Sequence, residues 1–176
     1  NNMIGNFLKS AFLGLLAFSL CACSDDDSVK KLITFHSGSE RANALASNRT
    51  LEVMPISTVS VMTDTNHFMY NGDLQKVHVA EVTLPDGKPM RGFYFICNSR
   101  GAKRLFQATA SNMGGYIVVK YDGNVIGLRR IDMPINDGKI FVTPEIPLED
   151  DLQKLVDEMN MAIETINEIK DEVNSW

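Results

Sequence analysis

Residues 99–128 read SRGAKRLFQATASNMGGYIVVKYDGNVIGL, and this stretch decides the fold because it places a helix directly before a β-hairpin. Asn98 or Ser99 can accept hydrogen bonds from the first free N–H groups, so either can cap a helix that continues to Met113. Gly114 then ends the helix as a residue that tolerates a positive φ. The expected apolar face has helical spacing and consists of Ala102, Leu105, Phe106, Thr109 and Met113.

The hairpin is predicted from two apolar runs, Tyr116–Tyr121 and 125–128, that flank Asp122-Gly123. An Asp-Gly pair between apolar runs is a strong hairpin signal, because a type I′ turn needs a positive φ at both central residues. The helix and the hairpin together predict an α+β unit in this part of the chain.

Further strand signals on both sides of this stretch complete the predicted sheet. Alternating or continuous apolar residues predict strands at 51–54, 59–62, 77–84, 90–97 and 139–143. Turn residues at 85–89 and 136–138 separate the later strands, and a long helix is predicted from near Leu148 toward the end of the chain. The predicted fold class is therefore α+β, an antiparallel sheet of hairpins packed by one internal helix and one long C-terminal helix.

Taken together, residues 99–135 resemble the head subdomain of the first periplasmic domain of SecD and SecDF, membrane proteins that assist Sec-dependent export. The family pattern has a Gly-Ala-basic-basic start, a Thr, an Asn-x-Gly helix end, an Asp-Gly-x-Val-Ile hairpin and a later Pro-Ile. The matching residues are Gly101-Ala102-Lys103-Arg104, Thr109, Asn112, Gly114, Asp122-Gly123-Asn124-Val125-Ile126 and Pro134-Ile135. Weaker matches at Asn71-Gly72-Asp73-Leu74, Ile140 and 148–152 extend the resemblance to about residues 68–160.

This resemblance implies that residues 51–176 form a SecD head-like domain that contacts polypeptide or Sec components. No apolar segment after residue 22 is long enough to span a membrane, so only the binding role of the head is expected to transfer. The candidate surface is a sheet edge or the loop at Asp122, Gly123 and Asn124, together with Arg129 and Arg130. The family usually has a Pro where Arg129 stands, and a charged edge strand is the alternative explanation of the arginine pair.

The N-terminal residues predict where the protein works. An apolar run at 11–20 followed by Leu20-Cys21-Ala22-Cys23 resembles the lipobox of bacterial lipoproteins. It implies a signal peptide at 1–22 and a lipid on Cys23, with an ordinary cleaved signal or an uncleaved anchor as alternatives. Residues 23–50 are predicted to be a flexible tether, in which 25–27 are an acidic spacer or a surface-export signal. The expected location is the cell envelope, lipid-anchored in the outer membrane on its periplasmic or surface face.

Composition narrows the possible chemistry. The net charge of −5 argues against nucleic acid as a partner, which calls for a basic face. Cys97 lies in an apolar run and is expected to be a buried, inert thiol. His36, His67 and His78 show no metal-ligand spacing, and turn geometry accounts for Asp122 and Asp137. We therefore expect no metal, no cofactor and no enzymatic activity.

The C-terminal helix carries an apolar stripe at heptad spacing that is longer than the helix of the SecD family. Its a and d positions are Leu152, Leu155, Met159, Ala162, Ile166, Ile169 and Val173. The first turns are expected to pack on the sheet. The remaining residues, Ala162, Ile166, Ile169 and Val173, are a candidate assembly face that needs cover from the same sheet, a second copy or another protein. A homo-oligomer is thus the second functional hypothesis, that of a structural or surface lipoprotein.

Overall fold

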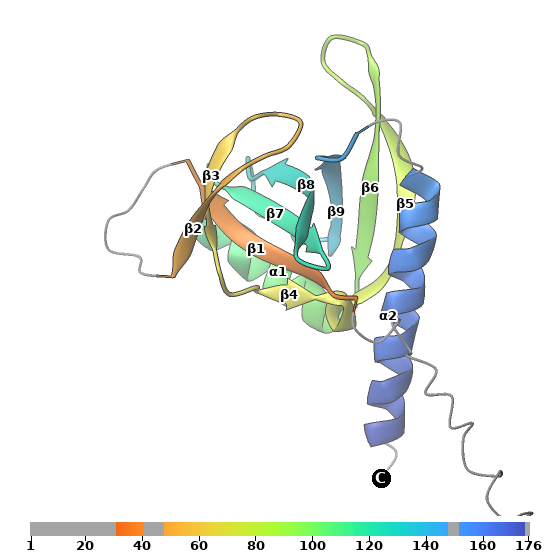
Figure 1. Cartoon of the computed structure of the whole chain (residues 1–176). Helices are drawn as coiled ribbons and strands as arrows, with labels where there is room; N and C mark the ends of the chain where they lie inside the picture. The colour runs from red at the N-terminus through yellow and green to blue at the C-terminus, as the bar shows by residue number, and fades with distance from the viewer. Residues whose placement is uncertain (1–30, 41–47, 148–151, 175–176) are drawn as a thin grey trace, which may run out of the picture.

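The structure, a computed structural model, describes residues 31–40, 48–147 and 152–174. In these ranges nine strands form one antiparallel sheet, and two α-helices pack with it (Figure 1). This arrangement confirms the predicted α+β class, with one internal helix and one long C-terminal helix.

The strand order along the sheet is β2-β3-β1-β7-β8-β9-β6-β5, and β4 pairs with β1 beside this path. The strands are β1 (Ile33–Ser39), β2 (Arg49–Val53), β3 (Ser60–Asp64), β4 (Met69–Tyr70), β5 (Leu74–Thr83), β6 (Pro89–Cys97), β7 (Tyr116–Tyr121), β8 (Asn124–Arg130) and β9 (Lys139–Pro144). A short 3-10 turn, η2 (Asn71–Asp73), precedes β5, and the helices are α1 (Ser99–Ser111) and α2 (Leu152–Asn174).

The hairpins follow the turn chemistry of the sequence. Asp122 and Gly123 have φ of 50° and 79° between β7 and β8, as a type I′ turn requires. Gly87, with φ of 82°, lies in the turn between β5 and β6, which pair along most of their length. The seven strands predicted from apolar patterning in residues 51–143 are all present as β2, β3 and β5–β9, with ends that differ by a few residues at most.

The prediction of a flexible tether over 23–50 is wrong for β1 and for the start of β2. β1 lies inside the sheet, where it pairs with β7 along six residues and also with β3 and β4. Ile33 and Phe35 are fully buried, whereas the strand also contains His36, Ser37 and Ser39, whose polarity concealed it in the sequence. The domain therefore includes residues from 33 onward; residues 23–30 and 41–47 lie outside the described part.

The main core lies between the sheet and both helices. Phe35, Phe93 and Phe95 are fully buried there, and the rings of Phe35 and Phe95 meet edge to face with centroids 5.1 Å apart. Leu105 of α1 and Val156 of α2 belong to the same cluster, so the two helices cover one continuous core. A second, smaller cluster on the opposite face consists of Met54, Val61, Tyr116, Val118 and Leu128.

Helix α1 is shorter and less apolar than predicted. Asn98 is the N-cap, and its side chain accepts hydrogen bonds from the N–H groups of Arg100 and Gly101. The helix ends at Ser111, before the predicted end. Leu105 and Thr109 are fully buried, but the side chains of Phe106 and Met113 are about half exposed, so the buried face is narrower than the apolar pattern indicates.

His36 is nearly fully buried in β1. Its Nδ1 lies 2.8 Å from the backbone oxygen of Asp64, and its Nε2 lies 2.9 Å from the hydroxyl of Thr34. The carbonyl can only accept, so Nδ1 donates and the hydroxyl donates to a neutral Nε2. Burial is the largest cause of a lowered His36 pKa, because it penalises the charged imidazolium.

We predict that His36 makes the fold less stable in mild acid. The unfolded chain takes up a proton below the ordinary His36 pKa of 6.5, while the folded chain, with its lowered pKa, does not. Stability therefore falls as the pH decreases from 6.5 toward the folded pKa. Urea unfolding at several pH values should show that the free energy of unfolding decreases less with falling pH in His36→Asn than in the wild type. His78→Asn, which alters an exposed histidine, should keep the wild-type dependence, and an unchanged slope in His36→Asn would contradict the prediction.

Candidate functional site

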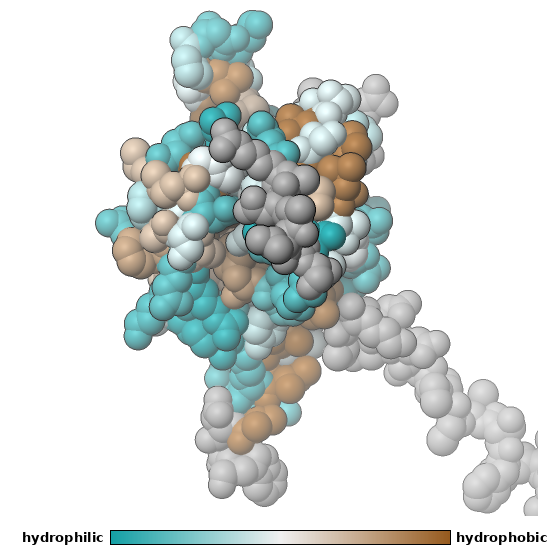
Figure 2. Space-filling model, turned by 90° about the vertical axis from the view of Figure 1, so that its left-hand side faces the viewer, coloured by the Kyte–Doolittle hydropathy of each residue, from teal (hydrophilic) through white to brown (hydrophobic). Residues whose placement is uncertain are grey.

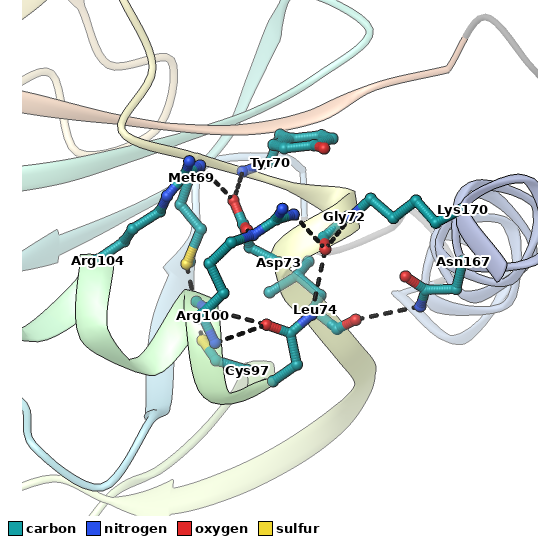
Figure 3. Close-up of polar contacts among 12 residues, drawn as sticks. Met69, Tyr70, Gly72, Asp73, Leu74, Cys97, Arg100, Arg104, Asn167 and Lys170 are labelled. Carbon is teal, nitrogen blue, oxygen red and sulfur yellow. Dashed lines mark hydrogen bonds and ion pairs between the residues drawn. The ribbon is translucent and has the colours of Figure 1, made fainter. Parts of the chain in front are cut away.

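A buried carboxylate organises the junction between η2 and α1. Asp73 is fully buried, and its Oδ1 accepts from Arg100 Nε at 2.6 Å while its Oδ2 accepts from Arg104 Nη1 at 2.9 Å (Figure 3). The backbone N–H of Tyr70 donates to the same Oδ2 at 3.2 Å. Arg100 and Arg104 are four residues apart, so both lie on one face of α1 and both reach the same carboxylate.

The carbonyl of Gly72 is a second convergence point in the same turn. It accepts from Asn98 Nδ2 at 3.1 Å, from Arg100 Nη2 at 3.0 Å and from the ammonium group of Lys170 in α2. A Cβ on Gly72 would lie 2.2 Å from Lys170 Nζ, so glycine keeps this approach open. Lys170 also lies over the ring of Tyr70, with Nζ 5.1 Å from the ring centroid. The turn therefore ties α2 to α1 through one carbonyl.

Gly101 explains why the helix begins with the Gly-Ala-basic-basic motif. A Cβ on Gly101 would lie 2.1 Å from the backbone oxygen of Asp73, which excludes any side chain at this position. The same Asp73 oxygen accepts the N–H of Asn98 at 3.0 Å. The motif thus serves the packing of α1 on η2. Since both oxygens of the Asp73 carboxylate are occupied by donors, the cluster is built to position elements.

Helix α2 covers one edge of the sheet with side-chain amides. Asn160 Nδ2 donates to the backbone oxygen of Val77 at 2.9 Å, and the Val77 N–H donates to Asn160 Oδ1 at 3.0 Å. Asn167, seven residues further, donates to the backbone oxygen of Leu74 at 3.3 Å. β5 is the last strand on this side of the sheet, so these asparagines satisfy backbone groups that another strand would otherwise pair. The seven-residue spacing of Asn160 and Asn167 is a signal in the sequence that a search for apolar patterns alone does not detect.

The predicted binding residues do not form one surface. Asp122, Gly123 and Asn124 are exposed at one end of β8, whereas Arg129 and Arg130 lie at its other end. At about 3.3 Å per residue, the two groups are roughly 17 Å apart. β8 as a whole is not an edge strand, because it lies between β7 and β9, so the charged edge-strand explanation can apply only at the end of the strand that carries the arginines. Arg129 and Arg130 follow the last residue of β8 that pairs with β9.

The predicted assembly face is divided by the structure. Ala162 is buried, as are Met159 and Ile163 of the same helix, and Ile166 is half-buried. Ile169 and Val173 are 42% and 68% exposed, on the part of α2 that projects below the sheet in Figure 1. Self-packing therefore accounts for the stripe up to Ile163 and for part of Ile166.

Cys97 lies apart from the histidines, of which His36 and His67 are neighbours with ring centroids 6.2 Å apart. Cys97 is buried, with its Sγ 3.7 Å from Met69 Sδ, and burial followed by the charges of Asp73 and Asp137 raises the pKa of the thiol to about 12. It is the inert thiol that the sequence predicts. His78 lies on β5 beside Tyr94. Among the described residues, no group of three His, Cys, Asp or Glu side chains is placed to hold a metal ion. Cys23 lies outside these residues.

Comparison with known proteins gives a match only at the level of structure. No protein-family model and no curated protein sequence matches the chain. One structural match, described as a membrane component SecDF that enhances protein export, has a TM-score of 0.49 and 17% identity over 77% of this chain and 63% of that chain. A second, SecDF in a super-membrane-facing form, has a TM-score of 0.50 and 18% identity over 77% of this chain and 19% of that chain.

The fold is SecD-like. This chain spans less than two thirds of the length of either SecDF chain. Within the described residues, neither helix has the length and apolar content needed to cross a bilayer.

We predict that Asp73 is the residue on which the α1–η2 junction depends. Asp73→Asn removes the charged acceptor of two arginines inside the fold and should lower the free energy of unfolding by about 3 kcal/mol. Urea unfolding followed by circular dichroism measures this change. Asp132→Asn is the matched control, because Asp132 is exposed and forms only a 3.5 Å ion pair with Arg130. Equal effects of the two substitutions would show that the buried cluster has no special role.

Proposed function

We propose that this chain is a lipid-anchored cell-envelope protein whose SecD-like domain binds polypeptide or a component of the export machinery, without catalysis. The supporting observation is the fold, which is similar to SecDF over 77% of this chain. The proposal extends the binding role that the SecD resemblance implies to a domain in which Gly72, Asp73 and Gly101 hold the helices in place.

The anchor is the second part of the proposal. The Leu-x-Ala-Cys sequence ending at Cys23 supports lipidation, and Lys31, where the described structure begins, is only eight positions after Cys23. At about 3.3 Å per residue, this segment is at most roughly 27 Å long when extended. The domain would therefore work close to the membrane surface, in the outer membrane on its periplasmic or surface face.

Cross-linking in the native envelope tests the proposed partner. The anchored protein is cross-linked in intact cells and purified. We expect Sec translocon subunits or incompletely folded exported chains to co-purify with it and to be identified by mass spectrometry. Cys23→Ser is the matched control: it keeps the domain but removes the lipid-accepting thiol, and it should recover less of the same partners. Recovery of this protein alone, or of the same partners at equal yield from the control, would contradict the proposal.

A structural role through α2 is the alternative function, favoured by the exposed Ile169 and Val173. Figure 2 shows brown, hydrophobic atoms along the projecting lower part of the molecule, in keeping with these exposed residues. Apolar side chains on a projecting helix are stabilised by contact with another apolar surface.

The alternative predicts a dimer that depends on this end of the helix. Sedimentation velocity should show a dimer for the wild type and a monomer for the double variant Ile169→Ser, Val173→Ser, because the contact would lose its apolar side chains. The matched control is Glu164→Ser, Glu168→Ser, which changes exposed acidic residues of the same helix and should stay dimeric. A monomeric wild type would rule out this role.

A further inference from the structure

The two edge strands of the sheet, β5 and β2, differ in what contacts their outer backbone groups. At β5, side-chain amides of Asn160 and Asn167 occupy backbone groups of the last strand. At the other end, β2 is the last strand of the described part of the sheet. Figure 2 faces the side of the molecule on which β2 and β3 lie in Figure 1.

The pairing of β2 with β3 fixes which backbone groups point outward. The N–H of Met54 donates to the Val59 oxygen at 2.8 Å, and the N–H of Thr65 donates to the Asn48 oxygen at 2.9 Å. Hydrogen-bonded and non-hydrogen-bonded pairs alternate along an antiparallel ladder. The backbone N–H and C=O groups of the even-numbered residues between these two pairs, Thr50 and Glu52, therefore point toward β3. The N–H and C=O groups of Leu51 and Val53 therefore point away from the sheet.

The side chains at this edge lack the usual protection against strand pairing. Natural edge strands carry unpaired charges, prolines or bulges. β2 has no proline and pairs with β3 in a continuous register. Its charged residues are engaged on the sheet, Arg49 with Asp64 at 2.6 Å and Glu52 with Lys120. Of the three residues whose backbone groups point outward, Arg49 is held by Asp64, and the other two, Leu51 and Val53, are apolar and each 61% exposed.

The edge is also held in place before any partner arrives. Glu145, nearly fully buried after β9, accepts the N–H groups of Ile56 and Ser57 with its Oε2 at 2.9 and 3.0 Å. Met54 at the base of this turn is fully buried in the smaller core cluster. A preformed edge lowers the entropic cost of adding a strand to it.

We propose that β2 is a docking edge for an extended polypeptide segment, which adds to the sheet as a further strand. The outward N–H and C=O groups of Leu51 and Val53 are two residues apart, the spacing at which an extended backbone presents complementary groups. Their exposed side chains favour segments with apolar residues at alternate positions. This inference rests on the proposed function and assigns its polypeptide contact to β2 in place of the loop at Asp122 and Gly123.

Amide NMR on the full-length protein tests the site directly. The probe is a short peptide with valine at every second position and lysine at both ends. We expect the amide protons of Leu51 and Val53 to exchange quickly in the free protein and at least about tenfold more slowly with the peptide. Those of Thr50 and Glu52, already paired with β3, should change little. The same peptide with its central amides N-methylated keeps the side chains and charge but should bind about tenfold more weakly.

Variants at Leu51 separate the backbone from the side chain. Leu51→Pro removes an outward N–H that the ladder does not use, so the hairpin should persist while peptide affinity falls about tenfold. Leu51→Thr keeps the N–H and is the matched control, with a smaller loss. Thermal unfolding checks that both variants fold. If Leu51→Pro does not fold, the amide exchange of Leu51 and Val53 in the wild type still shows whether the peptide binds at β2.

Three results would overturn the proposed edge. Slow exchange at Leu51 and Val53 in the free protein would show that the chain itself or a second copy already occupies β2. Peptide binding that protects other amides, or that Leu51→Pro leaves unchanged, would keep the proposed function and reject this site. Failure to bind either this peptide or any unfolded exported segment would reject the proposed function as well.

Discussion

The buried carboxylate of Asp73 is the constraint on which the arrangement of elements depends. Its burial is compensated by hydrogen bonds, because two arginines of α1 and a backbone N–H donate to its two oxygens. Satisfying it fixes the start of α1 against η2, and the neighbouring Gly72 carbonyl then receives Lys170 of α2. One short turn therefore sets the positions of both helices relative to β5.

The second organising feature is that, in the part of the chain that the structure describes, a helix contacts one edge strand of the sheet, β5, but not the other, β2. Helix α2 contacts β5, and its asparagine amides take the place of a neighbouring strand at Leu74 and Val77. β2 has no such cover from the described residues, and its hairpin is fastened by Glu145 on the far side. The sheet therefore has one edge strand contacted by a helix and one edge strand that no described residue covers.

The sequence predicts well where local chemistry dominates. The Asp122-Gly123 turn, the hairpin of β5 and β6 and the cap of α1 all follow from residues that are adjacent in the chain. It predicts less well where distant residues decide. β1 was missed because only Ile33 and Phe35 carry its apolar signal, and their partners are on β7.

The candidate site shows the same limit. The sequence shows both Gly101-Ala102-Lys103-Arg104 and the segment that contains Asp73, but it does not show that they meet, because nothing local indicates that Arg100 and Arg104 converge on one carboxylate. Likewise, Asn160 and Asn167 look like interruptions of an apolar helix until Val77 and Leu74 of β5 are placed beside them. The open edge at β2 depends on the strand order, which local patterning does not give.

The position of β1 has a consequence for how the chain reaches its native state. This strand comes first among the described elements, yet its partners β3, β4 and β7 all follow it, and Ile33 pairs with Tyr121. Contacts between such distant residues close large loops and slow folding. Ile33 therefore lacks its partner Tyr121, and Phe35 lacks its partner Val119, until most of the domain has been synthesised. The domain completes its sheet late, by inserting its earliest strand between elements that emerge after it.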